Sequence, residues 1–429
     1  MKKKYIFVGI GIIFIIVMVS FVLLIKTVLW GRHMSFSESV GLQPPECSVK
    51  SVEKIRKGMY PKWSSTKNLI AFNDWNGGTA DIYTMKPDGT DLKCLTCDDK
   101  PEGIAGLFRH VGQSFWHPSG EYILFTAENS HSEPHEENMD KMPGIGHNHD
   151  IWIMTSDGKN YWRITNNPPD WGVIRPSFSH DGTMIYWNEE YSCERTTCPK
   201  PRPNHPNGEC CSFWSLSGKT RNAKGEEWAM WRIKFANITF GSEGPIISNI
   251  RTININELYP ELRFVEGSGF TPDDKHFIWE AADINNTFGG MMFWGDLYTC
   301  DLEGGSLKRL TEKRTPTLFV GNENEEYSPD GTKIVWTRSN SLFTGSKNEI
   351  YLMDADGSNK ARLTYFNKSG HPDHDFGYTC CSGELDWSPD GKRIIFGYRT
   401  SKLPISKYIW PSSNQELYML TFEGACGKL

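Results

Sequence analysis

Short apolar stretches alternate with small turn sequences between residues 63 and 422, and one unit returns six times. Each copy begins with an aromatic residue, passes through a turn rich in Ser, Pro, Asp and Gly, and ends in an apolar stretch. The unit Y-S-P-D-G-T-K-I-V-W is typical. A tight turn followed by β-branched and aromatic residues predicts a β-hairpin. The six copies start at Trp63, Trp116, Phe178, Phe270, Tyr327 and Trp387.

A second unit, alternating apolar and polar residues at period two, follows most copies and predicts another hairpin. It reads E-I-Y-L-M-D-A-D-G-S-N-K-A-R-L-T from Glu349 and recurs from Asp81, Asp150 and Asp296. The third copy is degenerate, and residues 227–235 are expected to replace it. The sixth stops after one strand, 416–422. Two hairpins per repeat make a four-stranded antiparallel sheet, so the sequence predicts an all-β, six-bladed β-propeller.

The units from Tyr327 and Glu349 resemble the repeats of the TolB-type β-propeller family, and the likeness covers roughly residues 60 to 424. This resemblance implies a propeller in an exported setting. TolB itself carries a second, smaller N-terminal domain and takes part in an envelope protein complex. The stretch before the first repeat of this chain is too short for that domain.

The two ends of the chain are expected to close the ring. The sixth repeat lacks its fourth strand, and residues 47–57 show a strand-like alternation. Pairing of 47–57 with 416–422 would leave no open sheet edge, which proteins avoid. Cys47 and Cys426 would then lie at one seam. A disulfide between them would contribute about 4 kcal/mol in the chain-entropy model, but other pairings and free thiols remain open.

The N-terminal segment has the features of a membrane anchor. Lys2, Lys3 and Lys4 precede an uncharged stretch, residues 5–25, which is long enough to cross a bilayer as a helix. The basic flank predicts a cytoplasmic N-terminus. We expect an uncleaved signal anchor, with a cleaved signal peptide and a buried core helix as alternatives. The expected order is a tip and anchor (1–30), a linker (31–46) and a propeller outside the cytoplasm (47–429), in the periplasm or at the cell surface.

Composition and motifs exclude some classes of function but do not identify a reaction. The chain has 46 basic and 52 acidic residues, for a net charge of −6, which argues against nucleic-acid binding. No G-x-S-x-G nucleophile elbow, P-loop, H-E-x-x-H helix, dinucleotide fingerprint or EF-hand loop occurs. These absences favour a binding module over an enzyme.

Eleven cysteines all lie between Cys47 and Cys426. An exported chain favours disulfides, and the odd number leaves at least one thiol free or paired with another chain. The C-x-x-C at Cys94 and Cys97 has no second pair at zinc-finger spacing, so a disulfide is favoured over zinc there. The further disulfide candidates are Cys193, Cys198, Cys210, Cys211, Cys380 and Cys381.

Two histidine clusters could hold a divalent metal, because imidazole together with carboxylate suits such ions. One contains His131, His135, His147 and His149 among acidic residues, and the other contains His371, His374 and Asp375. The alternatives are a solvated polar loop for the first cluster and an inter-blade loop for the second.

We label the strands of a blade a to d from the channel outward. Antiparallel order puts the b–c and d–a connections on one face. The long insertions 128–149, 191–226, 282–295, 340–348, 371–381 and 400–415 are all expected on that face.

Loops on a rigid scaffold often carry function. We therefore expect a propeller that binds an envelope or surface protein, or a glycan, through the elaborated face near the channel mouth. The alternative is an exported metal-dependent enzyme, a polysaccharide lyase or hydrolase, with a divalent metal ion as its cofactor.

Overall fold

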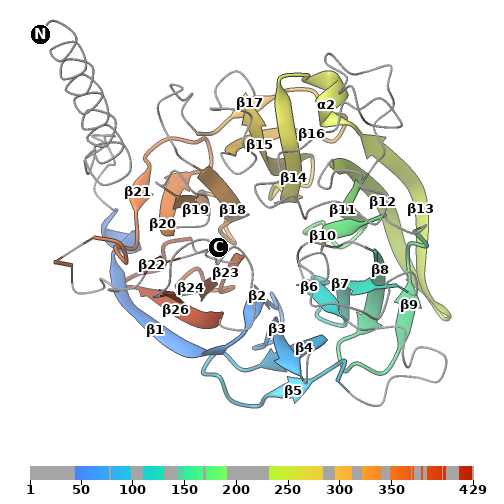
Figure 1. Ribbon diagram of the computed structural model, residues 1–429, viewed down its shortest axis with the longest axis horizontal. Helices are drawn as coiled ribbons and strands as arrows, with labels where there is room; N and C mark the ends of the chain where they lie inside the picture. Colours follow the sequence, from blue (N-terminus) through green and yellow to red (C-terminus); the bar gives the residue numbers. More distant parts are fainter. Residues whose placement is uncertain are drawn as a thin grey trace, which may run out of the picture. The chain divides into compact units, whose positions relative to one another are not determined.

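Six four-stranded antiparallel sheets surround a central axis (Figure 1), as the six hairpin repeats predict. In this computed structural model, the described residues are 44–427 without 77–78, 98–109, 130–143, 145, 147, 168–170, 191–230, 284–294, 312–320, 340–347, 369, 372–377, 380–383, 399 and 402–414. No helix among the described residues is long and apolar enough to span a membrane. The anchor expected at 5–25 lies outside them.

Each blade runs from its channel strand outward. Blade 1 contains β2 (Met59–Trp63), β3 (Ile70–Asn76), β4 (Thr79–Met85) and β5 (Lys93–Cys94). Blade 2 contains β6 (Val111–Trp116), β7 (Tyr122–Glu128), β8 (His149–Thr155) and β9 (Tyr161–Arg163). Blade 3 contains β10 (Val173–Phe178), β11 (Met184–Glu190), β12 (Trp231–Gly241) and β13 (Gly244–Ile253).

The second half follows the same order. Blade 4 contains β14 (Leu262–Phe270), β15 (His276–Asp283), β16 (Asp296–Asp301) and β17 (Lys308–Arg309). Blade 5 contains β18 (Gly321–Tyr327), β19 (Lys333–Ser339), β20 (Asn348–Asp354) and β21 (Ala361–Arg362). Blade 6 contains β23 (Leu385–Trp387), β24 (Arg393–Tyr398), β26 (Glu416–Phe422) and β1 (Val49–Lys57). The 3₁₀ helix η1 (Pro45–Cys47) and the α-helix α2 (Ile255–Leu258) are each a single turn or less.

The degenerate third repeat differs from the expectation. Its third strand, expected at 227–235, is β12, which runs to Gly241, and residues 227–230 lie outside the described residues. The strand continues because its turn is displaced to Gly241–Gly244, where Gly244 has a φ of +121°. The outer strand β13 is then ten residues long.

The S-x-D-G turns between the first and second strands are held by side chains as well as backbone. In blade 5, the Gly331 N–H donates to the Ser328 carbonyl at 2.8 Å, and the Ser328 hydroxyl donates to Asp330 at 2.6 Å. Gly331 has a φ of +70°, a left-handed conformation that glycine adopts without strain. This geometry explains why Asp and Gly recur at these turns.

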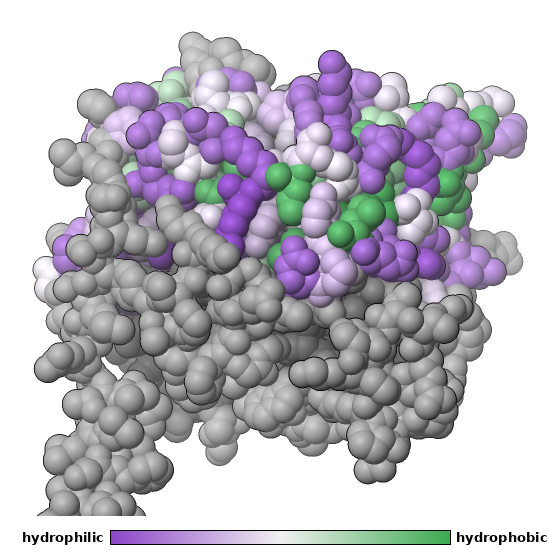
Figure 2. Space-filling view, turned by 90° about the horizontal axis from the view of Figure 1, so that it is seen from above, coloured by the Kyte–Doolittle hydropathy of each residue, from purple (hydrophilic) through white to green (hydrophobic). Residues whose placement is uncertain are grey.

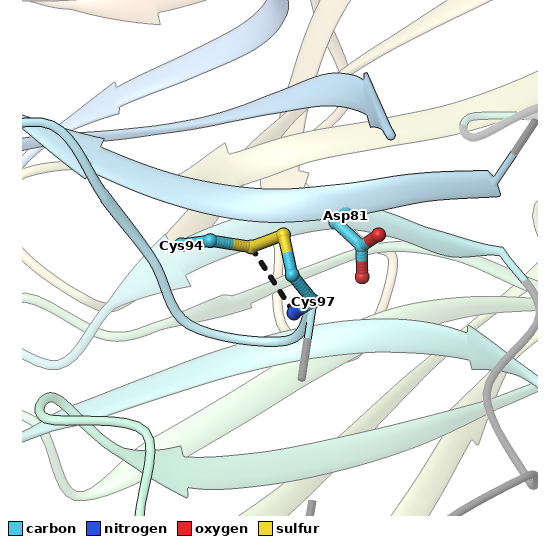
Figure 3. Close-up of side chains that lie close together, drawn as sticks. All are labelled: Asp81, Cys94 and Cys97. Carbon is cyan, nitrogen blue, oxygen red and sulfur yellow. Dashed lines mark hydrogen bonds between the residues drawn. A yellow bond between two sulfur atoms is a disulfide. The ribbon is translucent and has the colours of Figure 1, made fainter. Parts of the chain in front are cut away.

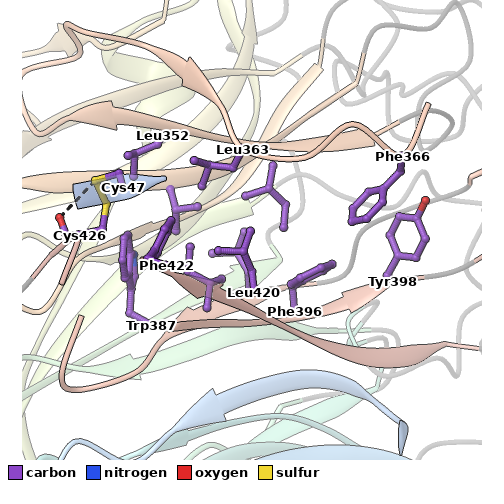
Figure 4. Packing of buried hydrophobic residues seen from close by; sticks show 14 residues of the cluster. Cys47, Leu352, Leu363, Phe366, Trp387, Phe396, Tyr398, Leu420, Phe422 and Cys426 are labelled. Carbon is purple, nitrogen blue, oxygen red and sulfur yellow. Dashed lines mark hydrogen bonds between the residues drawn. A yellow bond between two sulfur atoms is a disulfide. The ribbon is translucent and has the colours of Figure 1, made fainter. Parts of the chain in front are cut away.

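The ring is closed by both ends of the chain, as expected. Strand β1 pairs antiparallel with β26, from Val49 opposite Phe422 to Lys57 opposite Glu416. Beside this seam the structure joins Cys47 to Cys426 by a disulfide, with their Cα atoms 4.6 Å apart. Both cysteines are buried in the apolar cluster of blades 5 and 6 (Figure 4). The disulfide therefore reinforces a seam that hydrogen bonds and apolar packing already hold.

Two short strands outside the blades pair with each other. Strand β22 (Tyr378–Thr379) precedes β23, and β25 (Thr400–Ser401) follows β24. They belong to a d–a and a b–c connection, so their pairing agrees with the prediction that both kinds of connection share one face. On the face of the molecule that Figure 2 shows, the described residues are largely hydrophilic, with small apolar patches.

We expect Cys47→Ser to lower the free energy of unfolding by about 4 kcal/mol, because the reduced chain loses the constraint on a very long loop. Denaturant titration under non-reducing conditions measures the change. Cys426→Ser and the double variant should give the same loss, since each removes the same bond. Wild-type stability in Cys47→Ser would contradict the closure of the ring by this disulfide.

Candidate functional site: the propeller channel

The strands that line the channel carry polar residues where a buried strand would normally be apolar. The clearest case is β18, whose sequence G-N-E-N-E-E-Y contains three glutamates. The residues three positions before the repeat aromatics form a ring of equivalent positions, with one member from each blade. They are Tyr60, Gln113, Arg175, Gly267, Asn324 and Glu384.

Three of these six residues have a strained backbone. Tyr60, Arg175 and Asn324 have φ values of +51°, +47° and +58°. Each lies at a register shift between the first and second strands of its blade, where a β-bulge interrupts the ladder. Bulges and left-handed non-glycine residues concentrate at functional sites, because they redirect a side chain at an energetic cost.

The buried side chain of Arg175 connects four blades. Its Nε donates to Glu384 Oε1 at 3.1 Å, its Nη2 to Asn324 Oδ1 at 2.6 Å and its Nη1 to Ser268 Oγ at 3.2 Å. Nη1 also lies 3.1 Å from Glu266 Oε1. These partners belong to blades 6, 5 and 4. One guanidinium from blade 3 therefore links blades 3, 4, 5 and 6 to one another.

A fifth blade joins through Gln113 of blade 2. Its Oε1 accepts from the Arg175 backbone N–H at 2.7 Å, and its Nε2 donates to Glu384 Oε1 at 2.5 Å. Glu384 Oε1 therefore accepts hydrogen bonds from both side chains.

Blade 1 enters the network through the buried Lys62. Its ammonium pairs with Glu326 of blade 5 and lies over the Phe115 ring of blade 2, 4.8 Å from the centroid. The Trp63 N–H donates to Asp386 of blade 6 at 2.5 Å. Burial alone would lower the pKa of Lys62, but Glu326 and the neighbouring carboxylates outweigh this and raise it.

Carboxylates outnumber cations in the channel. Among the residues that the structure describes, Lys62 and Arg175 supply positive charge to this network, and seven carboxyl groups interact with them. Burial raises the pKa of each of Glu323, Glu325 and Asp386 to about 7. The seven carboxyl groups are Glu266, Glu280, Glu323, Glu325, Glu326, Glu384 and Asp386.

A small pocket lies within this cluster. Lys62, Phe115 and Arg175 line it together with residues of β14, β18 and blade 6. Among the described residues, Glu384 Oε2 and Glu280 Oε2 are buried without a hydrogen-bond partner. Unsatisfied buried carboxylate oxygens are costly, so they mark where a ligand with donors or positive charge would gain most.

Most of the predicted site residues lie outside the described residues: His131, His135, His147, His374, Asp375, Cys193, Cys198, Cys210, Cys211, Cys380 and Cys381. His149 is fully buried at the start of β8. The His371 ring stacks on Tyr365, with centroids 4.5 Å apart. A metal site at either histidine cluster therefore stays a prediction. Cys94 and Cys97 form a disulfide, and Cys300 is a buried free thiol.

The channel network was not predicted from the sequence. Arg175 and Glu384 are 209 residues apart, so no local motif connects them. The available signal was the polar composition of β18, together with the equivalent position three residues before each repeat aromatic.

No family model matches the sequence, and no curated protein matches it. Among solved structures, the chain is similar to TolB from Acinetobacter baumannii, with 15% identity and a TM-score of 0.43. This match covers 83% of the chain but 64% of that TolB, which is less than two thirds of its length.

Two further structures are similar to a comparable extent. A putative TolB from Agrobacterium tumefaciens shows 13% identity and a TM-score of 0.43, covering 86% of this chain and 96% of that one. An oligogalacturonate lyase in complex with manganese shows 11% identity and a TM-score of 0.43, covering 90% and 93%.

We expect Arg175→Met to lower the free energy of unfolding by about 3–5 kcal/mol, because it leaves buried carboxylates without their cation. Thermal or denaturant unfolding at neutral pH measures the loss. The matched control is Arg251→Met, which removes an exposed pair with Glu303 and should cost less than about 1 kcal/mol. Equal losses in the two variants would contradict the central role of Arg175.

The raised carboxyl pKa values also predict a pH dependence. In the folded chain Glu323, Glu325 and Asp386 hold protons up to a pKa of about 7, whereas the unfolded chain releases them near pH 4. Their contribution to stability is therefore complete below about pH 4 and is lost as the pH rises through about 7.

We expect the free energy of unfolding to fall between about pH 5 and pH 7.5, and Glu325→Gln to make this fall shallower. Glu303→Gln, at an exposed position, is the control and should leave the slope unchanged. An identical slope in Glu325→Gln and wild type would show that Glu325 is not protonated in the fold.

Proposed function

We propose that the chain is an extracytoplasmic binding protein, anchored in the membrane through residues 5–25, whose channel receives a positively charged segment of a partner protein. The observation that carries this proposal is the surplus of carboxylates around Lys62 and Arg175. A channel lined by one sign of charge concentrates ligands of the opposite sign, because its low-dielectric walls focus the field.

A cationic side chain of the partner would stabilise the carboxyl groups of the channel in two ways. It would offer N–H donors to the unsatisfied oxygens of Glu280 and Glu384. It would also favour the ionised forms of Glu323 and Glu325, whose pKa values near 7 make their protons easy to release. Binding should therefore release protons at neutral pH and weaken as the pH falls.

Access from the elaborated face supports this proposal. The first strand of each blade begins on the face that carries the b–c and d–a connections. Glu323 lies in the first half of β18, Glu384 lies just before β23, and Glu266 lies at the middle of β14. A partner bound to the loops could thus reach the carboxylates. The same geometry disfavours an acidic polysaccharide, because its carboxylates would be repelled by those of the channel.

A metal-dependent enzyme is the second candidate, and the same carboxylates favour it. Several carboxylate oxygens in one place suit hard divalent cations such as Ca²⁺ and Mn²⁺. The two candidates differ in the ligand that the channel binds first, a cationic peptide or a metal ion, so one titration series separates them.

The test titrates the purified full-length chain with a decalysine peptide by isothermal calorimetry, at low and at physiological salt. We expect Glu280→Gln/Glu325→Gln to bind at least about tenfold more weakly than wild type, because the variant removes two channel carboxyl groups that a bound cation would ionise. Glu243→Gln/Glu303→Gln removes two exposed charges and should stay within about twofold.

Equal weakening in the channel and surface variants would overturn the proposal, because attraction would then reflect net charge alone. Ca²⁺ and Mn²⁺ are titrated into the same proteins. Stoichiometric metal binding that depends on Glu280 and Glu325, without peptide binding, would favour the enzyme instead.

A further inference from the structure

Three blades share an ion pair between a buried carboxylate at the start of the third strand and a partly exposed arginine. Asp150, Asp296 and Glu349 each accept a hydrogen bond from an arginine on the outermost strand of the same blade. Each also accepts one from a threonine two residues after that arginine. The arginines are Arg163, Arg309 and Arg362.

Blade 1 keeps the carboxylate and the threonine but not the arginine. Asp81 accepts from Thr96 Oγ1 at 2.7 Å. Cys94 stands where the other blades have arginine: it lies opposite Tyr83 in the ladder, as Arg309 lies opposite Tyr298. Asp81 is 3% exposed, and no lysine or arginine of the described residues forms an ion pair with it. Blade 1 thus has a buried carboxylate at the position where the carboxylates of blades 2, 4 and 5 pair with an arginine.

Two sulfur atoms occupy the space beside this carboxylate. Cys94 and Cys97 are joined by a disulfide, and both sulfurs lie within 4.8 Å of the nearest suitable oxygen of Asp81 (Figure 3). Among the residues that the structure describes, no other group of three such side chains comes this close together. The Tyr83 hydroxyl lies 3.2 Å from Cys97 Sγ, where it could donate to a thiolate.

We propose that Asp81, Cys94 and Cys97 form a redox-gated site for a thiophilic divalent cation, with Zn²⁺ as the best match. The oxidised chain holds the disulfide and cannot bind the metal. Reduction by a phosphine breaks the S–S bond. The phosphine gives two electrons and takes the oxygen atom of one water molecule. The two protons of that water protonate the two sulfurs, which become thiols. Binding of Zn²⁺ then releases these two protons as both thiolates and the Asp81 carboxylate coordinate the ion.

The chemistry of the three groups selects the metal. Two thiolates and one carboxylate favour Zn²⁺ over Ca²⁺ or Mg²⁺, which prefer oxygen ligands alone. With Zn–S bonds of about 2.3 Å, the sulfurs would separate to about 3.8 Å in a tetrahedral site, and water would take the fourth position. This site lies on the outer half of blade 1 and does not depend on the channel function.

The test uses the purified full-length chain, reduced with tris(carboxyethyl)phosphine, and Co²⁺ as a spectroscopic substitute for Zn²⁺. We expect reduced wild type to show a sulfur-to-cobalt charge-transfer band. Its intensity should exceed that of Cys97→Ser by the amount expected for one bound Co²⁺ per chain, and added Zn²⁺ should abolish the band. Other cysteines contribute equally to both proteins, so the difference reports this site. Non-reduced wild type provides a comparison without any substitution. It should lack the additional charge-transfer intensity that reduced wild type shows.

Asp81→Asn tests the carboxylate. It keeps the size of the side chain and should lower Co²⁺ affinity at least about tenfold. The matched control is Asp296→Asn, which alters the equivalent carboxylate of blade 4, where Arg309 is present, and should change the affinity less than about twofold. No difference between reduced wild type and Cys97→Ser would overturn the proposal, as would equal affinities in Asp81→Asn and Asp296→Asn.

Discussion

The pairing of Arg175 with carboxylates from neighbouring blades is the interaction on which the centre of this propeller depends. A guanidinium can serve several acceptors at once because its donors form a rigid planar fork. Here it contacts Glu384, Asn324 and Ser268, which belong to three different blades. Without that cation, the channel would hold buried carboxylates that repel one another, and the inner strands could not approach so closely.

The outer parts of the ring are held by different forces. Apolar clusters fill the space between adjacent blades, and the ends of the chain meet in the β1–β26 ladder. These contacts are made by apolar side chains and by backbone hydrogen bonds, neither of which titrates. The apolar packing of the outer layers therefore lets the channel keep more carboxyl groups than a small core could tolerate.

The sequence allowed the blades to be predicted because hairpins are local. A turn such as 328–331 and the strand after it lie within twelve residues, and the seam at residues 47–57 follows from counting strands. The channel could not be predicted in this way. Its contacts join residues such as Gln113 and Glu384, 271 positions apart, and depend on bulges that no pattern of apolar residues reveals. The unusual polarity of residues 321–327 was the sequence feature that indicated polar residues in the channel.

The most direct measurement is a double-mutant cycle on Arg175→Met and Glu384→Gln, with the free energy of unfolding determined for all four proteins. If Arg175 organises the channel, the two losses are strongly non-additive, with a coupling energy above about 2 kcal/mol. Losses that add to within about 0.5 kcal/mol would contradict the account, because the two residues would then contribute to stability independently.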